Sequence, residues 1–129
     1  MNQLNIPAGH QQVMPYLILI NAGEFFTFMK SVFNAEERSK VMKTETEIMH
    51  AELVVGNCTI MFADGGDQFP AENAGLFIYV QDVDVTYRKA LEAGASSRME
   101  PADQPYGRSC GVKDPFGNTW WITSPPGKL

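Results

Sequence analysis

The sequence has few cysteines, few basic residues and no long hydrophobic run. Its two cysteines, Cys58 and Cys110, cannot form a disulfide framework and lack the paired spacing of a zinc site, so we expect partly buried, reduced thiols. Ten basic against 15 acidic residues give a net charge of −5, the opposite of the balance that nucleic-acid binding requires. The longest apolar runs, among them residues 16–20, are too short to cross a membrane, and the N-terminus has no signal-peptide pattern. These absences predict a cytoplasmic protein with no nucleic-acid or membrane partner.

What is present is typical of a globular protein. Hydrophobic residues make up 44% of the 129 residues and charged residues 19%, which excludes a disordered chain. This length favours a single domain over residues 1–129 with a buried core. Turn residues divide it into a first module of about residues 13–65 and a second module of about residues 75–125. Residues 1–12 are polar and are expected to form a loose lead-in with a solvated His10.

Hydrophobic patterning predicts the same element order in both modules: a strand, a helix and three strands. In the first module, Asn21 begins a capping-box pattern at the start of the helix, and Asn34 is its expected end. In the second, Asp82 or Asp84 caps the helix and Gly94 stops it. The predicted strands cover residues 13–20, 36–43, 46–55, 58–63, 75–80, 96–99, 106–113 and 119–123, with a loop over residues 101–105.

The two modules match one another at an offset of 60 residues, which places Thr59 on Thr119 and His50 on Cys110. Self-similarity at a fixed period signals duplicated units. One βαβββ unit alone cannot cover its sheet face, whereas two can enclose a cavity. We therefore predict an α+β fold in which two βαβββ modules form curved mixed sheets around a cavity, with the helices outside.

Three stretches carry a resemblance to a known family. They read MPYL at residues 14–17, MHAEL at residues 49–53 and DPFGN at residues 114–118. Together with the repeat, they resemble the vicinal oxygen chelate superfamily, which includes glyoxalase I, bleomycin-resistance proteins and extradiol dioxygenases. The likeness covers residues 13–125 and is greatest to a bacterial glyoxalase-related branch labelled 3-demethylubiquinone methyltransferase-like. It implies two half-barrels around a ligand cavity and a homodimer, but no single reaction, because fold does not determine function.

The resemblance also implies where a metal would bind, because metal-dependent members take four ligands from the first and fourth strands of each module. Matched to this sequence, those positions hold Pro15, Met61, Gly75 and Trp121. None of these side chains suits a divalent zinc, nickel, iron or manganese ion. The positions one residue later are no better, since they hold Tyr16, Phe62, Leu76 and Trp120. We therefore expect no metal site and no cofactor.

Two polar groups are candidates for chemistry. His50 and Glu52 are two residues apart on one predicted strand, so they share a face and could act as a general base pair or as part of a metal site. A cross-strand polar pair is the alternative. Tyr106, Arg108 and Cys110 alternate along another predicted strand. There Arg108 could hold a ligand carboxylate or phosphate and Tyr106 could donate a hydrogen bond, or Arg108 could pair with a surface acid.

Aromatic side chains are the candidates for ligand binding. Trp120 and Trp121 are adjacent, so one should face the cavity and the other a helix or a partner. Plain core packing is the alternative for each. Further rings on neighbouring strands are Tyr16, Phe62, Phe77 and Tyr79. A cavity lined by such rings suits a flat or cationic organic molecule.

Two functions follow from these features. The first is metal-independent binding of a small organic molecule in an aromatic-lined cavity. The alternative is an enzyme of the lyase, isomerase or dioxygenase type that uses a non-standard site around His50, Glu52, Tyr106 or Arg108. A methyltransferase is not supported, because no glycine-rich loop follows a strand and opens a helix to hold a nucleotide-like cofactor. The ligand, the strand faces that line the cavity, and the pairing of modules within or between chains stay open at this level.

Overall fold

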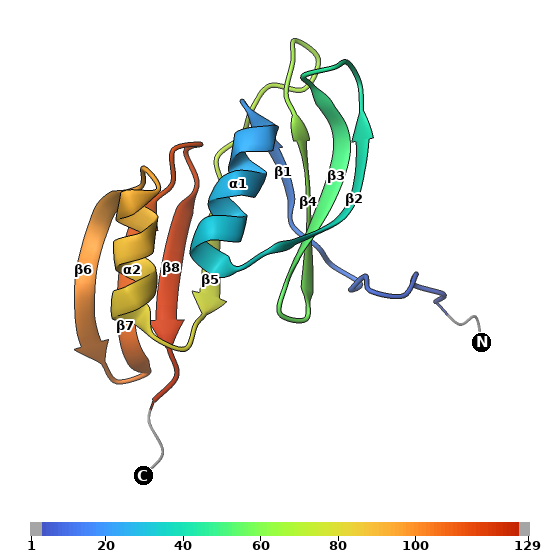
Figure 1. The fold of residues 1–129 in the computed structure, drawn as a ribbon. Helices are drawn as coiled ribbons and strands as arrows, with labels where there is room; N and C mark the ends of the chain where they lie inside the picture. The colour runs from blue at the N-terminus through green and yellow to red at the C-terminus, as the bar shows by residue number, and fades with distance from the viewer. Residues whose placement is uncertain (1–3, 127–129) are drawn as a thin grey trace. The chain divides into compact units, whose positions relative to one another are not determined.

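Two βαβββ repeats make up the computed structural model, which describes residues 4–126 (Figure 1). The first repeat contains β1 (Tyr16–Leu19), α1 (Ala22–Phe33), β2 (Glu36–Met42), β3 (Ile48–Val55) and β4 (Cys58–Asp64). The second contains β5 (Gly75–Tyr79), α2 (Val83–Glu92), β6 (Ser96–Gln104), β7 (Gly107–Lys113) and β8 (Thr119–Ser124). Each repeat forms one four-stranded sheet, in the orders β1-β4-β3-β2 and β5-β8-β7-β6. The outer pairs β1/β4 and β5/β8 are parallel and the other neighbours antiparallel, so the predicted α+β class and the mixed sheets are confirmed.

Contacts within the chain define two compact units, and the division runs through α1. The first unit contains the residues up to Phe26 together with Asn34–Glu72, and the second contains Thr27–Phe33 together with the residues from Asn73 onward. Each unit has its own sheet and its own buried residues. A single domain over residues 1–129 stays a prediction. Within residues 4–126, no helix is long and apolar enough to cross a bilayer.

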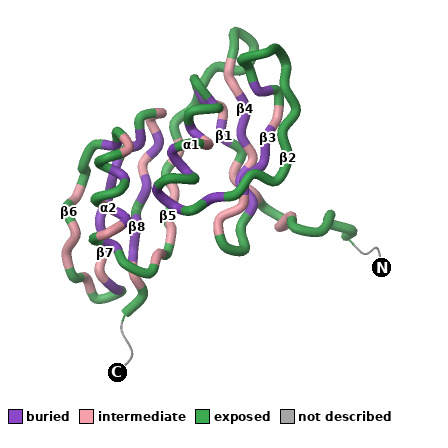
Figure 2. The backbone as a smooth tube through the Cα atoms, in the orientation of Figure 1, coloured by how far each residue is buried: buried purple, intermediate pink, exposed green. Residues whose placement is uncertain are grey.

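The two faces of the first sheet differ because side chains alternate along each strand. Leu17, Leu53 and Phe62 are buried on the face toward α1, where the rings of Phe25 and Phe62 lie 5.3 Å apart. Figure 2 shows the resulting change between buried and less buried positions along the strands. The opposite face, which we call the first open face, carries Tyr16, Ile18, His50, Glu52 and Met61.

The start of α1 differs from the predicted capping box. Asn21 has φ 64°, a left-handed conformation, whereas a capping residue is extended. Asp64, at the end of β4, takes the capping role instead. Its carboxylate accepts hydrogen bonds from the backbone nitrogens of Ala22 at 2.9 Å and of Ile48 at 2.7 Å, which joins the helix to β3 and β4. At the other end, Asn34 with φ 59° terminates α1 as predicted.

The second sheet has one face covered by helices. Trp120 and Cys110 are buried there, and the Trp120 ring lies 4.9 Å from the ring of Phe33 in α1. Helix α2 contacts β6, β7 and β8. Asp82 caps this helix by accepting a first-turn hydrogen bond at 3.2 Å, and Gly94 with φ 104° follows its end, both as predicted.

The hairpin between β6 and β7 differs from the sequence prediction. Strand β6 continues through Pro101 to Gln104, where a loop over residues 101–105 is expected. Proline is tolerated because β6 is an edge strand whose register with β7 shifts next to this residue. As a result Tyr106 lies in the turn before β7 and does not alternate with Arg108 along a strand.

The expected equivalence between His50 and Cys110 is wrong. His50 lies on the first open face, whereas Cys110 is fully buried on the helix side of its sheet. Strand pairing makes Gly111 the counterpart of Glu52, because each lies opposite the corresponding residue of the last strand in its repeat. Relative to the 60-residue offset, β7 is therefore shifted by one residue against β3. Because side chains alternate along a strand, a shift of one residue moves each side chain to the opposite face.

Candidate functional site

A group of hydrogen-bonded polar side chains lies on the first open face. His50 Nε2 is 3.0 Å from Glu52 Oε2, and His50 Nδ1 is 3.1 Å from the hydroxyl oxygen of Tyr16. The other carboxylate oxygen of Glu52, Oε1, is 2.8 Å from His10 Nε2 and 3.6 Å from Arg38 Nε. Side chains from β1, β2, β3 and the N-terminal segment thus meet around one carboxylate. We call these five residues the Glu52 cluster.

The carboxylate determines where the protons of the Glu52 cluster lie. An ionised carboxylate only accepts hydrogen bonds, so His10 and His50 both donate to it from Nε2–H. In the neutral imidazole, His50 Nδ1 is then an acceptor, and the Tyr16 hydroxyl donates to it. The hydrogen bond from His50, and next the one from His10, hold the pKa of Glu52 below its ordinary value of 4.5, although burial acts in the opposite direction.

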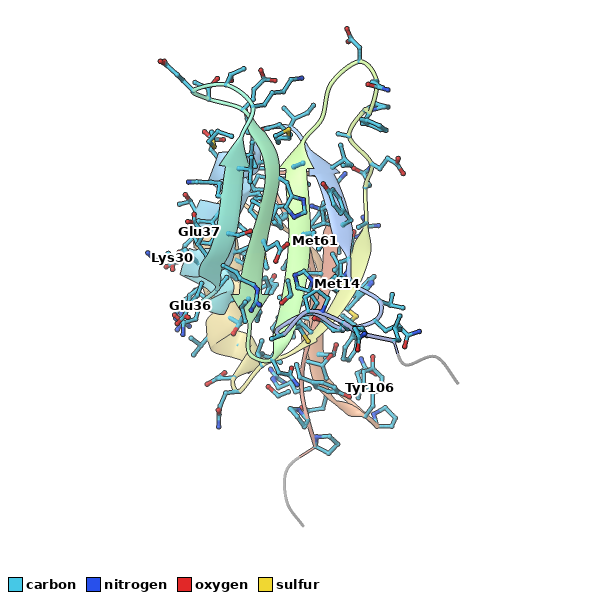
Figure 3. All side chains as sticks on the ribbon, turned by 90° about the vertical axis from the view of Figure 1, so that its right-hand side faces the viewer. Met14, Lys30, Glu36, Glu37, Met61 and Tyr106 are labelled. Atoms are coloured by element: carbon cyan, nitrogen blue, oxygen red, sulfur yellow. The ribbon has the colours of Figure 1, made fainter. Side chains whose placement is uncertain are left out.

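Residues 8–11 of the N-terminal segment (residues 4–15) are bound to the first sheet, so for them the expectation of a loose lead-in with a solvated His10 is wrong. Residues 1–3 of the expected lead-in lie outside the described residues. Backbone carbonyls of the segment accept hydrogen bonds from Arg38 and from Thr59 Oγ1. The side-chain amide of Gln11 pairs with the backbone of Thr59 at 3.1 and 3.2 Å. Figure 3 shows the segment near Met14, at the lower end of the strands. No local pattern signals these contacts, since the residues joined are 30 to 50 positions apart.

The lowered pKa of Glu52 predicts a stability contribution that depends on pH. A carboxyl group with a depressed pKa stabilises the folded state above its unfolded value of 4.5 and loses this contribution as the pH falls through the folded value. The difference in free energy of unfolding between the wild type and Glu52→Gln should therefore be constant just above pH 4.5 and shrink at lower pH. Urea unfolding at a series of acidic pH values measures it. A difference that grows on acidification would contradict the assignment.

A cavity of about 340 Å³ opens beside the Glu52 cluster, within the first unit. Tyr16 belongs to both, because it lines the cavity and bonds to His50. The other walls come from β1, the loop after β4, and the β2–β3 connection. Among the lining residues are Ile18, Lys43, Met49, Asp67 and Phe69. Apolar walls with a few charged groups are typical of sites for small organic molecules.

Arg108 is engaged by acids of the second unit. Its Nε and Nη2 bind the two carboxylate oxygens of Asp84 at 2.8 and 3.1 Å, and its Nη1 is 3.2 Å from Asp103 Oδ1. The hydrogen bonds from Arg108 lower the pKa of Asp84. This is the surface pairing that the sequence leaves as the alternative to ligand binding. Tyr106 lies in the turn before β7, so it does not share a strand face with Arg108.

The aromatic candidates separate into exposed and buried groups. Phe77, Tyr79 and Trp121 are exposed on the face of the second sheet opposite the helices, with Phe77 paired to Trp121 and its ring 5.1 Å from that of Tyr79. Trp120 and Trp121 point to opposite faces, as their adjacency predicts. Phe62 and Trp120 are core residues, because the alternation of their strands turns them toward the helices. Neither is available on an open face.

The donor set at the positions matched to metal ligands does not fit a divalent ion. On the first open face, Tyr16 pairs with Met61, so Tyr16 stands where the family match places Pro15. On the second sheet, Phe77 pairs with Trp121, so Phe77 stands where the family match places Gly75. A phenol, a thioether, a phenyl ring and an indole offer no site for zinc, nickel, iron or manganese. Within residues 4–126, no group of three His, Cys, Asp or Glu side chains has a geometry that could hold a metal ion.

Both cysteines are free thiols, as the sequence predicts, but the expectation of partial burial is wrong for Cys58. Cys58 is exposed at the start of β4, and Cys110 is buried in β7. Burial raises the pKa of the Cys110 thiol to about 11, so this thiol is protonated at neutral pH and is a small core residue.

Known proteins resemble this chain over most of its length. Residues 16–122 match the Glyoxalase/Bleomycin resistance protein/Dioxygenase superfamily. The uncharacterized protein Mb0911c of Mycobacterium bovis is 30% identical over 123 residues, which cover 86% of this chain and 81% of that protein.

Two solved structures share the fold at low sequence identity. The fosfomycin resistance protein FosX of Listeria monocytogenes superposes with a TM-score of 0.73 at 16% identity, over 90% of this chain and 94% of that one. The PhnB protein of Bacillus cereus, a proposed 3-demethylubiquinone-9 3-methyltransferase, superposes with a TM-score of 0.68 at 19% identity, over 88% of this chain and 99% of that one. With the sequence match and the two βαβββ repeats, these findings show that the chain belongs to the Glyoxalase/Bleomycin resistance protein/Dioxygenase superfamily, as its resemblance to vicinal oxygen chelate proteins predicts.

Proposed function

We propose that this protein binds a small organic molecule in the cavity of its first unit. The observation that carries the proposal is the cavity itself, of about 340 Å³, whose walls combine the rings of Tyr16 and Phe69 with aliphatic side chains and few charges. A pocket of this size and composition accommodates a small, flat molecule. The fold shared with a fosfomycin resistance protein agrees with a small-molecule ligand.

The second sheet offers a separate aromatic surface for a ligand. Phe77, Tyr79 and Trp121 present their rings to solvent, which favours stacking against a flat or cationic group. Arg108 contributes less than the sequence suggests, since its guanidinium is held by two acids. A homodimer, a cytoplasmic location and a single domain belong to the same proposal, and sedimentation of the purified chain tests the first of them.

Filling the cavity tests the proposal directly. Compounds from a small-molecule library that bind the folded chain should raise its melting temperature, because binding at about 100 times Kd adds about 2.7 kcal/mol of stability. Ile18→Trp places an indole in the cavity wall and should abolish these shifts, whereas Ile20→Trp, on an exposed residue outside the cavity, should retain them. Met49→Trp gives a second filling variant at a more exposed wall position.

Two outcomes would overturn the proposal. One is a library in which no compound stabilises the wild type. The other is a set of compounds whose stabilisation survives in both filling variants, since those compounds would bind elsewhere.

A further inference from the structure

We propose that the Tyr16–His50–Glu52 part of the Glu52 cluster accepts a proton from the molecule in the cavity, so that the site takes weakly acidic O–H or N–H compounds. This inference rests on the ligand cavity proposed above and adds an acid–base role to it. It stands on the placement of Tyr16, which lines the cavity and whose hydroxyl bonds to His50.

Tyr16 lines the cavity, and its hydroxyl oxygen can still accept a hydrogen bond. Its one hydrogen is donated to His50 Nδ1 at 3.1 Å, and 46% of the residue is exposed. The oxygen lone pairs that remain can only accept a hydrogen bond. A molecule that pairs with Tyr16 must therefore supply a donor, which selects hydroxyl or N–H compounds over ethers, esters and ketones.

The same arrangement provides a path for the donated proton. The ligand O–H or N–H bond breaks and its proton joins the Tyr16 oxygen, while the Tyr16 hydrogen moves to His50 Nδ1. The ligand becomes an anion and His50 becomes an imidazolium, so charge and atoms balance without another reactant. Glu52 stabilises the new positive charge, because its Oε2 is 3.0 Å from His50 Nε2.

Glu52 acts as a positioning residue in this scheme. By accepting from His50 Nε2–H, it keeps the proton on Nε2 and leaves Nδ1 free for Tyr16. His10 from the N-terminal segment and Arg38 from β2 hold the other carboxylate oxygen. Glu52 is only 8% exposed, so this orientation is maintained away from solvent.

Charged groups around the cavity complete the electrostatics. Lys43 lies in the cavity wall, where its ammonium group favours an anionic ligand, and Asp67 in the same wall opposes one. Asp64 also lines the cavity, but its two carboxylate oxygens accept hydrogen bonds from the backbone nitrogens of Ala22 and Ile48. Asp64 therefore contributes negative charge to the cavity, and each of its oxygens already accepts one hydrogen bond.

A chromogenic acid tests the proposal. The probe is 4-nitrophenol, whose phenolate and phenol absorb at different wavelengths, with 4-nitroanisole as a matched compound that lacks the hydroxyl. Bound 4-nitrophenol should ionise about tenfold more readily than the free compound, measured as the shift of its absorbance titration at saturating protein. The His50→Gln variant should still bind the probe, but bound 4-nitrophenol should then ionise no more readily than the free compound. Tyr16→Phe should bind it more weakly, and 4-nitroanisole should bind the wild type weakly.

The role of Glu52 has its own readout. In ¹⁵N spectra of the histidine side chains, His50 of the wild type should show one tautomer with the proton on Nε2. Glu52→Gln should give a mixture of tautomers and a reduced shift in probe ionisation, and Glu52→Asp should restore part of both. A purely structural role would lower the melting temperature without changing the tautomer.

The outcomes distinguish this proposal from the proposed function. Probe binding with unchanged ionisation would overturn the proton transfer and leave ligand binding intact. If library compounds bind the cavity but 4-nitrophenol and other O–H and N–H acids do not, the proposed ligand class is wrong. The proposal of a ligand cavity would then still stand. No stabilising compound of any kind would overturn both.

Discussion

Replacing Asp114 with alanine is expected to lower the free energy of unfolding by about 3 kcal/mol or more, because each buried donor left unsatisfied costs about 1–3 kcal/mol. Asp114 is buried in the turn before β8. Its carboxylate accepts hydrogen bonds from the backbone nitrogens of Phe116 at 2.8 Å and Asn118 at 2.9 Å, and from Trp120 Nε1 at 2.8 Å. Alanine removes the acceptor of all three, and chemical denaturation of the variant measures the loss.

Two variants serve as controls for Asp114→Ala. Asp114→Asn keeps the shape and one acceptor oxygen, so it should fall between alanine and the wild type. Asp67→Ala removes a carboxylate from an exposed loop and should leave the free energy of unfolding within about 0.5 kcal/mol of the wild type. An Asp114→Ala loss below about 1 kcal/mol would show that the turn does not depend on this carboxylate.

Gly107→Ala is expected to cost a similar amount, about 3 kcal/mol or more, from two effects that act together. Gly107 has φ +132°, a backbone conformation that residues with a Cβ rarely adopt. A Cβ at this position would also lie 2.1 Å from the backbone oxygen of Ser124 in β8. Because the obstacle is backbone of the adjacent strand, no side-chain rotation relieves it, and the end of β8 must move.

A glycine in an open position provides the matched control. Gly75, in β5, has open space within 4 Å of the place that a Cβ would take and no positive φ, so Gly75→Ala should be neutral or slightly stabilising. Thermal unfolding of the two variants side by side measures the difference. Equal melting temperatures for Gly107→Ala and Gly75→Ala would contradict the strain argument.

The ends of the helices show which features local sequence can predict. Asp82, Asn34 and Gly94 act as the cap and stops that their residue types indicate, because capping uses groups within one turn. The start of α1 does not follow this rule. There Asp64 of β4, distant in sequence, supplies the hydrogen bond that the local pattern assigns to Asn21.

The candidate site was predictable only in part. Two-residue spacing places His50 and Glu52 on one face, and the structure confirms that they share it. Tyr16 is a sequence candidate for ligand binding, yet only the pairing of β1 with β4 and β4 with β3 brings its hydroxyl to His50. Sequence reasoning missed His10, Arg38 and Lys43, because single polar residues in polar segments carry no periodic signal.

The sequence by itself determined the order of the elements, the repeat and the family, since these follow from patterns a few residues long and from motifs read along the chain. The tertiary structure decided which face each strand presents. One residue of register separates Gly111, on the face of Trp121, from Cys110, on the face toward the helices, and pairing with β8 sets that register. It also decided that the N-terminal segment binds the sheet through Glu52, because a hydrogen bond between residues 42 positions apart depends on how the whole sheet assembles.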